Sequence, residues 1–161
     1  MTSQETTGAT LRRATRADEP AVAALLTASS LPLDGMREAL PCFVVAEDAG
    51  EIVGVAGIED CGVAGEHALL RSVAVAPTWR SRGLGRELVT RAIADAEARG
   101  AKALYLLTTT ADRYFPTFGF TVTTRDAVPD DVQATAEFRG ACPATATVMT
   151  RALHQDLGAR A

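Results

Sequence analysis

Three arginines and two glycines lie close together between Arg80 and Arg86, in the order Arg-Ser-Arg-Gly-Leu-Gly-Arg. The apolar run Leu69–Ala76 precedes this segment, and a helical repeat follows it. A strand that leads through glycines into a helix forms an anion-binding site, because the first helical N–H groups have no acceptor within the helix and carry partial positive charge. Gly83 and Gly85 also let the backbone approach phosphate oxygens closely. The segment therefore predicts a site for an anion such as a phosphate.

Two common phosphate-binding motifs do not fit this segment. The P-loop pattern GxxxxGK[ST] does not occur in the chain. The dinucleotide pattern GxGxxG lacks its third glycine, because Leu88 occupies that position. What fits is Arg-x-x-Gly-x-Gly, from Arg80 to Gly85. The alternative interpretation is a surface turn that carries a cluster of arginines.

The elements that must position this segment alternate between strand and helix. Apolar and β-branched runs predict strands at Leu11–Ala14, Cys42–Glu47, Glu51–Glu59, Leu69–Ala76, Ala103–Thr108, Phe120–Thr124 and Ala144–Leu153. Helical spacing and caps predict helices at Asp18–Ser29 (capped by Asp18), Met36–Leu40, Gly83–Arg99, Ala111–Phe118 and Asp130–Phe138. This order predicts an α/β domain with a single mixed, twisted sheet of about six to seven strands flanked by helices. Val53, Val55 and Ile58 are core candidates, and Ala103–Thr108 suits the middle of the sheet.

Composition narrows the class of protein. A chain of 161 residues with 47% hydrophobic and 22% charged residues suggests one domain, which we place at residues 9–155, between a disordered tail at 1–8 and a second tail at 156–161. The net charge of −4 argues against a nucleic-acid or anionic-membrane partner. The three cysteines form no CxxC pair, which favours a cytoplasmic location. His67 and His154 lie far apart, so we expect no metal site.

The Arg-x-x-Gly-x-Gly segment resembles the pyrophosphate-binding signature of the GNAT N-acetyltransferases, which use acetyl-coenzyme A. A second GNAT pattern, Asn-x-x-Ala-x-x-x-Tyr-x-x-x-Gly-Phe, is matched in part downstream. Its positions hold Thr108, Ala111, Phe115, Gly119 and Phe120. In many members the Tyr protonates the leaving thiolate, which Phe115 cannot do. Phe115 is therefore interpreted as a packing residue, and solvent or the coenzyme would supply the proton.

A narrower resemblance covers residues 10–153. Gly57-Ile58-Glu59, Leu69–Val75, Leu106–Thr109 and the region from Phe138 to Ala144 are similar to the arsenic-resistance subgroup of GNAT proteins. Part of this pattern also resembles the acetyltransferase domain of N-acetylglutamate synthases. The resemblance implies a small amino-acid-like acceptor and a link to arsenic or toxic amino-acid resistance. It also implies direct transfer, with the enzyme either a monomer or a homodimer.

The resemblance further implies which residues hold each substrate. Acetyl-coenzyme A, a cosubstrate, would be bound by Val73, Ala74, Val75, Arg80, Ser81, Arg82, Gly83, Leu84, Gly85, Arg86 and Thr108. A backbone N–H in Val73–Val75 would polarise the thioester carbonyl. Thr109 is assigned to the acceptor side.

Two charged groups are candidates on the acceptor side. Arg71 lies inside an apolar strand, where a charge is costly unless it is paired, and a guanidinium suits the carboxylate of an amino acid. An internal salt bridge, for example to Glu59, is the alternative. Glu59 and then Glu66 are candidates for the base that deprotonates the amine, with His67 ranked lower. Glu66 could instead be a solvated loop carboxylate.

Other functions stay open at this point. Within the class, the acceptor could be a protein N-terminus or a lysine. From a different class, the chain could be a non-catalytic module that binds coenzyme A as a sensor, because the usual Tyr is replaced. An arsenic-binding role for Cys142 is less favoured than a buried structural cysteine.

Overall fold

The three strands nearest the N-terminus pair in antiparallel fashion, and a tight hairpin joins the second to the third. Strand β1 spans Thr10–Arg13, β2 spans Phe43–Asp48 and β3 spans Glu51–Cys61. The hairpin between β2 and β3 closes through Ala49 and Gly50, which both have positive φ. That conformation matches the twist of the two strands. Val45 pairs with Val55, so the apolar faces of β2 and β3 are in register.

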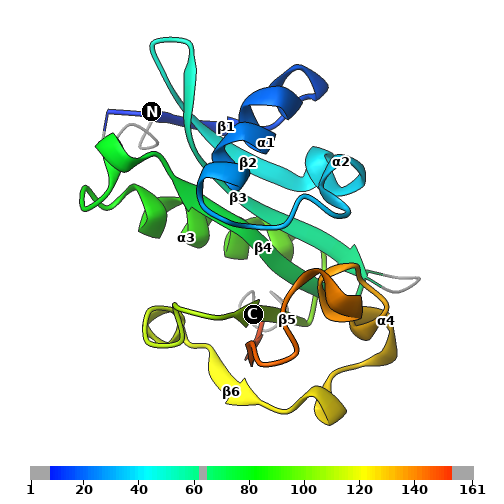
Figure 1. The fold of residues 1–161 in the computed structure, drawn as a ribbon. Helices are drawn as coiled ribbons and strands as arrows, with labels where there is room; N and C mark the ends of the chain where they lie inside the picture. Colours follow the sequence, from blue (N-terminus) through cyan, green and yellow to red (C-terminus); the bar gives the residue numbers. More distant parts are fainter. Residues whose placement is uncertain (1–7, 62–64, 154–161) are drawn as a thin grey trace. The chain divides into compact units, whose positions relative to one another are not determined.

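The computed structural model describes residues 8–61 and 65–153 (Figure 1). Their strands hydrogen-bond in the order β1-β2-β3-β4-β5-β7-β6, with β4 and β5 parallel and the other recorded pairs antiparallel. This confirms the predicted α/β fold with one mixed sheet. Apart from Gly8, the tails expected at 1–8 and 156–161 lie outside the described residues. None of the described helices is both long enough and apolar enough to cross a membrane.

The fold consists of two compact units, each built from separate stretches of chain. One runs to Ile58 and adds Arg71–Ala92, and the other contains Glu59–Leu70 and the chain from Ile93 onward. Strand β4 (His67–Val75) contributes its second half to the first unit. The helix α3 (Leu84–Ala98) contributes its first half to that unit.

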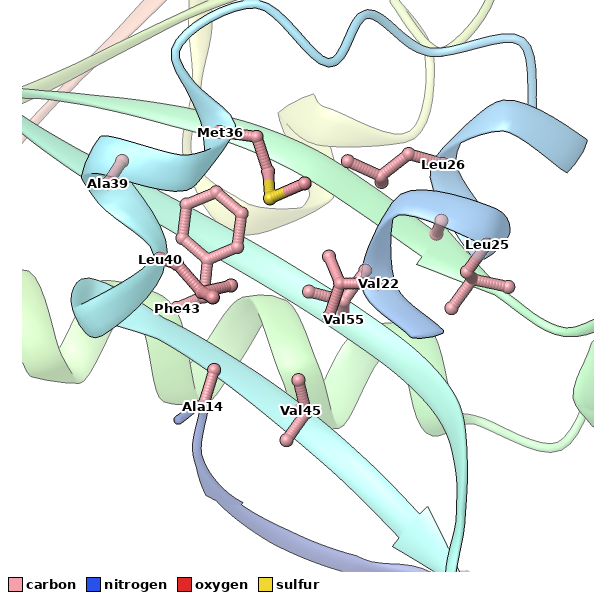
Figure 2. Close-up of a cluster of buried hydrophobic side chains, with 11 residues drawn as sticks. Ala14, Val22, Leu25, Leu26, Met36, Ala39, Leu40, Phe43, Val45 and Val55 are labelled. Carbon is pink, nitrogen blue, oxygen red and sulfur yellow. The ribbon is translucent and has the colours of Figure 1, made fainter. Parts of the chain in front are cut away.

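Helices α1 (Glu19–Ala28) and α2 (Met36–Ala39) cover one face of the strands in the first unit. Figure 2 shows Leu26 and Met36 pointing toward the cluster in which Phe43 and Val55 lie. All four side chains are buried. Gly57 makes room for this packing, because a Cβ at Gly57 would overlap the ring of Phe43.

Helix α3 packs on the opposite face of β3. A Cβ built at Gly54 would lie 2.7 Å from Cδ1 of Leu88. Leu84 and Leu88 are fully buried, as the predicted apolar stripe requires. The start of α3 is thereby held against β3 by close packing.

The second unit has its own core beside β5. Strand β5 (Ala103–Thr108) pairs with β7 (Thr147–Ala152) and with His67–Leu69 of β4, while β6 (Thr121–Thr123) pairs with β7. The central position predicted for β5 is therefore confirmed. The core cluster consists of Cys61, Leu69, Val128, Val132 and Val148, with Tyr105, Leu107 and Phe138 packed against it.

Three helix predictions need correction. The segment 111–118 forms a 3-10 turn at Phe115–Phe118 rather than a longer helix, because Pro116 lacks an N–H donor. The segment 130–138 divides into α4 (Asp130–Gln133) and a π-type turn at Glu137–Ala141. Between them, the Thr135 hydroxyl donates to the Val132 carbonyl oxygen and so competes with the helical bonding pattern.

The third correction concerns Asp18. Its carboxylate does not cap α1 but accepts a hydrogen bond from the Thr15 backbone N–H and ion-pairs with Arg12.

Candidate functional site

Strand β4 leads directly into the predicted anion-binding segment. Ala74 is buried in the core of the first unit, while Val73 and Val75 are half-buried. After a 3-10 turn at Pro77–Trp79, the chain passes through Ser81–Gly83 and enters α3 at Leu84. The predicted coenzyme residues from Val73 to Arg86 therefore lie together in the first unit.

The backbone of this loop has left-handed residues immediately before the helix. Ser81 has a φ of 65° and Gly83 a φ of 85°. Both residues are exposed, and among the described residues nothing lies within 4 Å of a Cβ placed on Gly83. An anion can thus approach the loop and the first turn of α3, where N–H groups lack helical acceptors.

Two arginine side chains contribute to the loop in different ways. Nε of Arg80 donates a hydrogen bond to the Val75 carbonyl oxygen at 3.1 Å. The guanidinium carbon of Arg82 lies 4.6 Å from the centre of the Trp79 ring, a cation–π contact. The Arg80 side chain therefore folds back onto β4. The sequence predicted only a contribution of charge from this residue.

The charge of the segment suits a single phosphate group or pyrophosphate. Residues 71–91 hold five arginines and one acid, Glu87, although the whole chain is acidic. The residues present thus fit a pyrophosphate by backbone donors, helix dipole and charge.

Arg71 lies on β4 in the same unit and is 3% exposed. Its Nε donates to Oγ of Ser72 at 3.0 Å, and its Nη2 donates to the Pro32 carbonyl oxygen at 3.4 Å. Ser72 is buried as well and has a φ of 60°. The sequence analysis identified Arg71 as a candidate and missed Ser72. The signal that could have found Ser72 is a polar residue inside an apolar strand.

The two candidate bases lie in the second unit, in different environments. Glu59 is half-buried on β3. Burial and, after it, the Glu59 carboxylate raise the pKa of the neighbouring Cys61 thiol. Glu66 is 52% exposed and lies 3.8 Å from Nζ of Lys102. The environment of Glu66 agrees with the interpretation as a solvated loop carboxylate.

Residues after β5 have mainly local contacts. The Thr108 hydroxyl oxygen accepts a hydrogen bond from the Ala111 backbone N–H at 2.9 Å, which closes the turn at the strand end. Thr109 is exposed. Phe115 is 7% exposed and packs edge-on against Phe120. Phe115 is therefore a packing residue, as its chemistry predicted.

A side-chain contact that sequence reasoning did not find joins the imidazole of His67 to the carboxylate of Asp131. Nδ1 of His67 lies 3.1 Å from each carboxylate oxygen of Asp131, and its ring is edge-on to Tyr105. No local pattern brings together residues that are 64 positions apart. Within 8–61 and 65–153, no three His, Cys, Asp or Glu side chains are placed to hold a metal ion.

One comparison with known proteins shows a family. Residues 11–120 match the sequence model of the acetyltransferase (GNAT) family. No curated protein matches the chain. Among solved structures, similarity extends to N-acetylglutamate synthase from Neisseria gonorrhoeae, complexed with coenzyme A and N-acetyl-glutamate. That structure has a TM-score of 0.78 and 23% identity over 91% of this chain, which spans 35% of the synthase chain.

Two smaller proteins match over most of their own length. A Mycobacterium tuberculosis protein in complex with CoA has a TM-score of 0.73 and 23% identity, covering 89% of this chain and 99% of its own. A GNAT family N-acetyltransferase from Escherichia coli in complex with CoA has a TM-score of 0.63 and 19% identity, covering 92% of this chain and 83% of its own. At these identities, the structural matches support the fold.

Proposed function

Because the chain belongs to the acetyltransferase (GNAT) family, we propose that it transfers the acetyl group of acetyl-coenzyme A to the amine of a small, carboxylate-bearing molecule. The observation that carries this proposal is the loop from Arg80 to Gly83 at the start of α3. It presents backbone donors and guanidinium charge to solvent immediately after a strand of the sheet. That arrangement suits the pyrophosphate of the coenzyme.

The proposed donor site extends from this loop along β4. Arg82, Gly83, Leu84, Gly85 and Arg86 would face the pyrophosphate, with Arg80 holding the loop against Val75. Backbone groups of Val73–Val75 would bind the pantetheine arm and polarise the thioester carbonyl. Thr108 is assigned to coenzyme A by the sequence resemblance alone.

The reaction needs a neutral amine. In the proposed step, the amine nitrogen attacks the thioester carbonyl carbon, the C–S bond breaks, and the amine gives up a proton to a base. The thiolate of coenzyme A then takes a proton from solvent, since Phe115 has no hydroxyl group. Glu59 is the preferred base because it is half-buried, whereas Glu66 is exposed near Lys102.

The acceptor is proposed to carry a carboxylate that binds Arg71. A planar guanidinium can form a bidentate pair with a carboxylate, and Arg71 is a buried cation on β4. The N-acetylglutamate synthase with similar structure was crystallised with N-acetyl-glutamate. Thr109 is assigned to the acceptor side, where its exposed hydroxyl could bond a polar group.

Release of coenzyme A thiol tests the function directly. The enzyme is incubated with acetyl-coenzyme A and each of the twenty L-amino acids, and then with the α-amide of every amino acid that reacts. We expect amine-dependent thiol release that is strongest with an amino acid and weaker with its α-amide. Thiol release with peptides and not with amino acids would instead indicate a protein acetyltransferase.

The buried Phe115 favours a second candidate, a sensor that binds coenzyme A without turnover. Calorimetric binding of coenzyme A together with no thiol release across all acceptors would identify the sensor. The link to arsenic or toxic amino-acid resistance stays a prediction from the sequence. It is tested by comparing growth of cells with and without the gene on arsenite and on toxic amino-acid analogues.

A further inference from the structure

Two neighbouring side chains of β4, Arg71 and Ser72, are both buried and hydrogen-bonded to each other. Arg71 is 3% exposed and Ser72 is 6% exposed. In a regular strand, consecutive side chains point to opposite faces of the sheet and cannot meet. Here Nε of Arg71 donates to Oγ of Ser72 at 3.0 Å.

The backbone of Ser72 explains how these side chains meet. Its φ of 60° lies in the left-handed region, which is unfavourable for a residue with a Cβ. Ala74 lies beyond this point and packs with Phe43 and Val55 on the face covered by α1 and α2. Arg71 also reaches that side, since its Nη2 bonds the Pro32 carbonyl between those helices. Residues three apart share a face only if the alternation is interrupted, and Ser72 is where it is interrupted.

Strained residues of this kind persist when surrounding contacts hold them, and they gather at functional sites. In this chain, the strained residue supplies a hydroxyl acceptor to the buried cation. The guanidinium is planar, so a bond at Nε fixes the direction in which its remaining N–H groups point. Pro32 adds a second fixed point at Nη2.

We propose that Ser72 is a positioning residue, whose hydroxyl orients the guanidinium of Arg71 for the carboxylate of the acetyl acceptor. This inference rests on the proposed function, because it assumes a carboxylate-bearing acceptor. It assigns to Ser72 a part in selecting amino acids over uncharged amines. Ser72 itself takes no part in the transfer step.

The test compares Ser72→Ala and Ser72→Gly, using an amino acid that the wild-type enzyme acetylates and its α-amide. Alanine removes the hydroxyl and keeps the Cβ, whereas glycine removes the hydroxyl and relieves the backbone. Loss of one hydrogen bond to a charged group corresponds to roughly a tenfold effect. We therefore expect both variants to raise KM for the amino acid about tenfold. Three other quantities should each change by no more than about twofold, well below the effect expected for the lost bond. They are kcat, KM for acetyl-coenzyme A and KM for the α-amide.

A double-mutant cycle with Arg71→Lys adds a readout that a purely structural role would not give. Lysine keeps the charge but has no Nε donor, so Ser72→Ala should have no further effect on KM in that background. Additive effects in the cycle would overturn the inference. So would wild-type kinetics in Ser72→Gly, which would indicate that backbone shape matters and the hydroxyl does not.

Failure of the inference and failure of the proposed function give different results. If the wild-type enzyme acetylates no amino acid, the proposed function is wrong and the inference falls with it. If the wild-type enzyme acetylates an amino acid and both Ser72 variants match its KM, the inference alone is wrong. Thermal unfolding of each variant guards against misfolding, and Ser72→Asn, which tolerates a positive φ and restores an acceptor, should recover the KM.

Discussion

Nε of Arg80 donates a hydrogen bond to the backbone carbonyl oxygen of Val75, which lies five residues earlier at the end of β4. This bond connects the two ends of the turn that contains Pro77–Trp79. The first arginine of the Arg-x-x-Gly-x-Gly segment thus has a structural task that its charge alone does not reveal. It fixes the path of the chain before the loop reaches α3.

Replacing Arg80 by lysine should separate this task from charge. Lysine keeps the positive charge but cannot donate from Nε in the same geometry. We expect the Kd for coenzyme A, measured by calorimetry, to rise about fivefold, in line with the loss of one hydrogen bond. Arg82→Lys is the matched control, since a lysine can keep the cation–π contact with Trp79. An unchanged Kd in both variants would show that charge alone matters.

Gly83→Ala should lower the affinity for coenzyme A as well as the free energy of unfolding. The φ of 85° disfavours a Cβ, and the added methyl group would stand where a phosphate must approach. Gly50→Ala is the control, because Gly50 has a φ of 84° and an equally open surrounding among the described residues. Both variants should lose about 1 kcal/mol of stability. Only Gly83→Ala should raise the Kd for coenzyme A, by about tenfold or more, as expected when backbone contacts to the ligand are lost. Similar binding in both variants would contradict the assignment of this loop.

The sequence predicted the sheet and the start of α3 well because both depend on local patterns. A near-continuous apolar run marked β5, and the change to helical spacing at Gly83 marked the start of α3 to within a residue. The left-handed Ser72 could not be predicted, since it is stabilised by packing and by Arg71. The pair of His67 and Asp131 also depends on the tertiary fold. The helices predicted after β5 were wrong because Pro116 and the Thr135 hydroxyl favour short turns.

Asp18 should make the stability of the protein depend on pH in the acid range. Hydrogen bonds from Arg12, above all, lower the pKa of Asp18 to about 2. An unfolded Asp has a pKa of about 3.9, so the stabilisation is complete above that pH and is lost as pH falls toward about 2. Asp18→Asn should lower the free energy of unfolding by about 2 kcal/mol at pH 7. The exposed Asp112→Asn serves as control.

Urea unfolding at several pH values measures this effect. The difference between wild type and Asp18→Asn should shrink steadily between about pH 4 and pH 2. A difference that persists unchanged at pH 2 would show that Arg12 and Asp18 stabilise the fold by other means.

Cys61 should be unreactive in the folded protein. Burial, followed by the nearby carboxylates of Glu59, Asp131 and Asp60, raises the pKa of its thiol to about 12. The reactive species is the thiolate, which is then scarce at pH 8. In a Cys42→Ser/Cys142→Ser variant, Ellman's reagent should release no thiolate chromophore until guanidinium unfolds the chain. Rapid release from the folded variant would contradict this prediction.

The choice between the candidate bases can be tested with matched substitutions. Glu59→Gln should lower kcat at pH 7 by about a hundredfold or more if Glu59 takes the amine proton. Its activity should recover at higher pH, where more of the amine is already neutral. Glu66→Gln should leave kcat within about twofold, a change too small for the loss of a general base. The reverse pattern would move the role to Glu66.

Gly54 and Gly57 lie on opposite faces of β3, one against Leu88 and the other against the ring of Phe43. With no side chain at either position, bare backbone separates the two helical layers there. The strand therefore acts as a spacer that sets how far apart these layers stand. A methyl group at Gly54 would displace Leu88, whereas a methyl group at Gly57 would displace the ring of Phe43. The two substitutions should therefore not compensate each other. The residue type at these two positions is consequently limited by the space between neighbouring groups rather than by hydrophobicity.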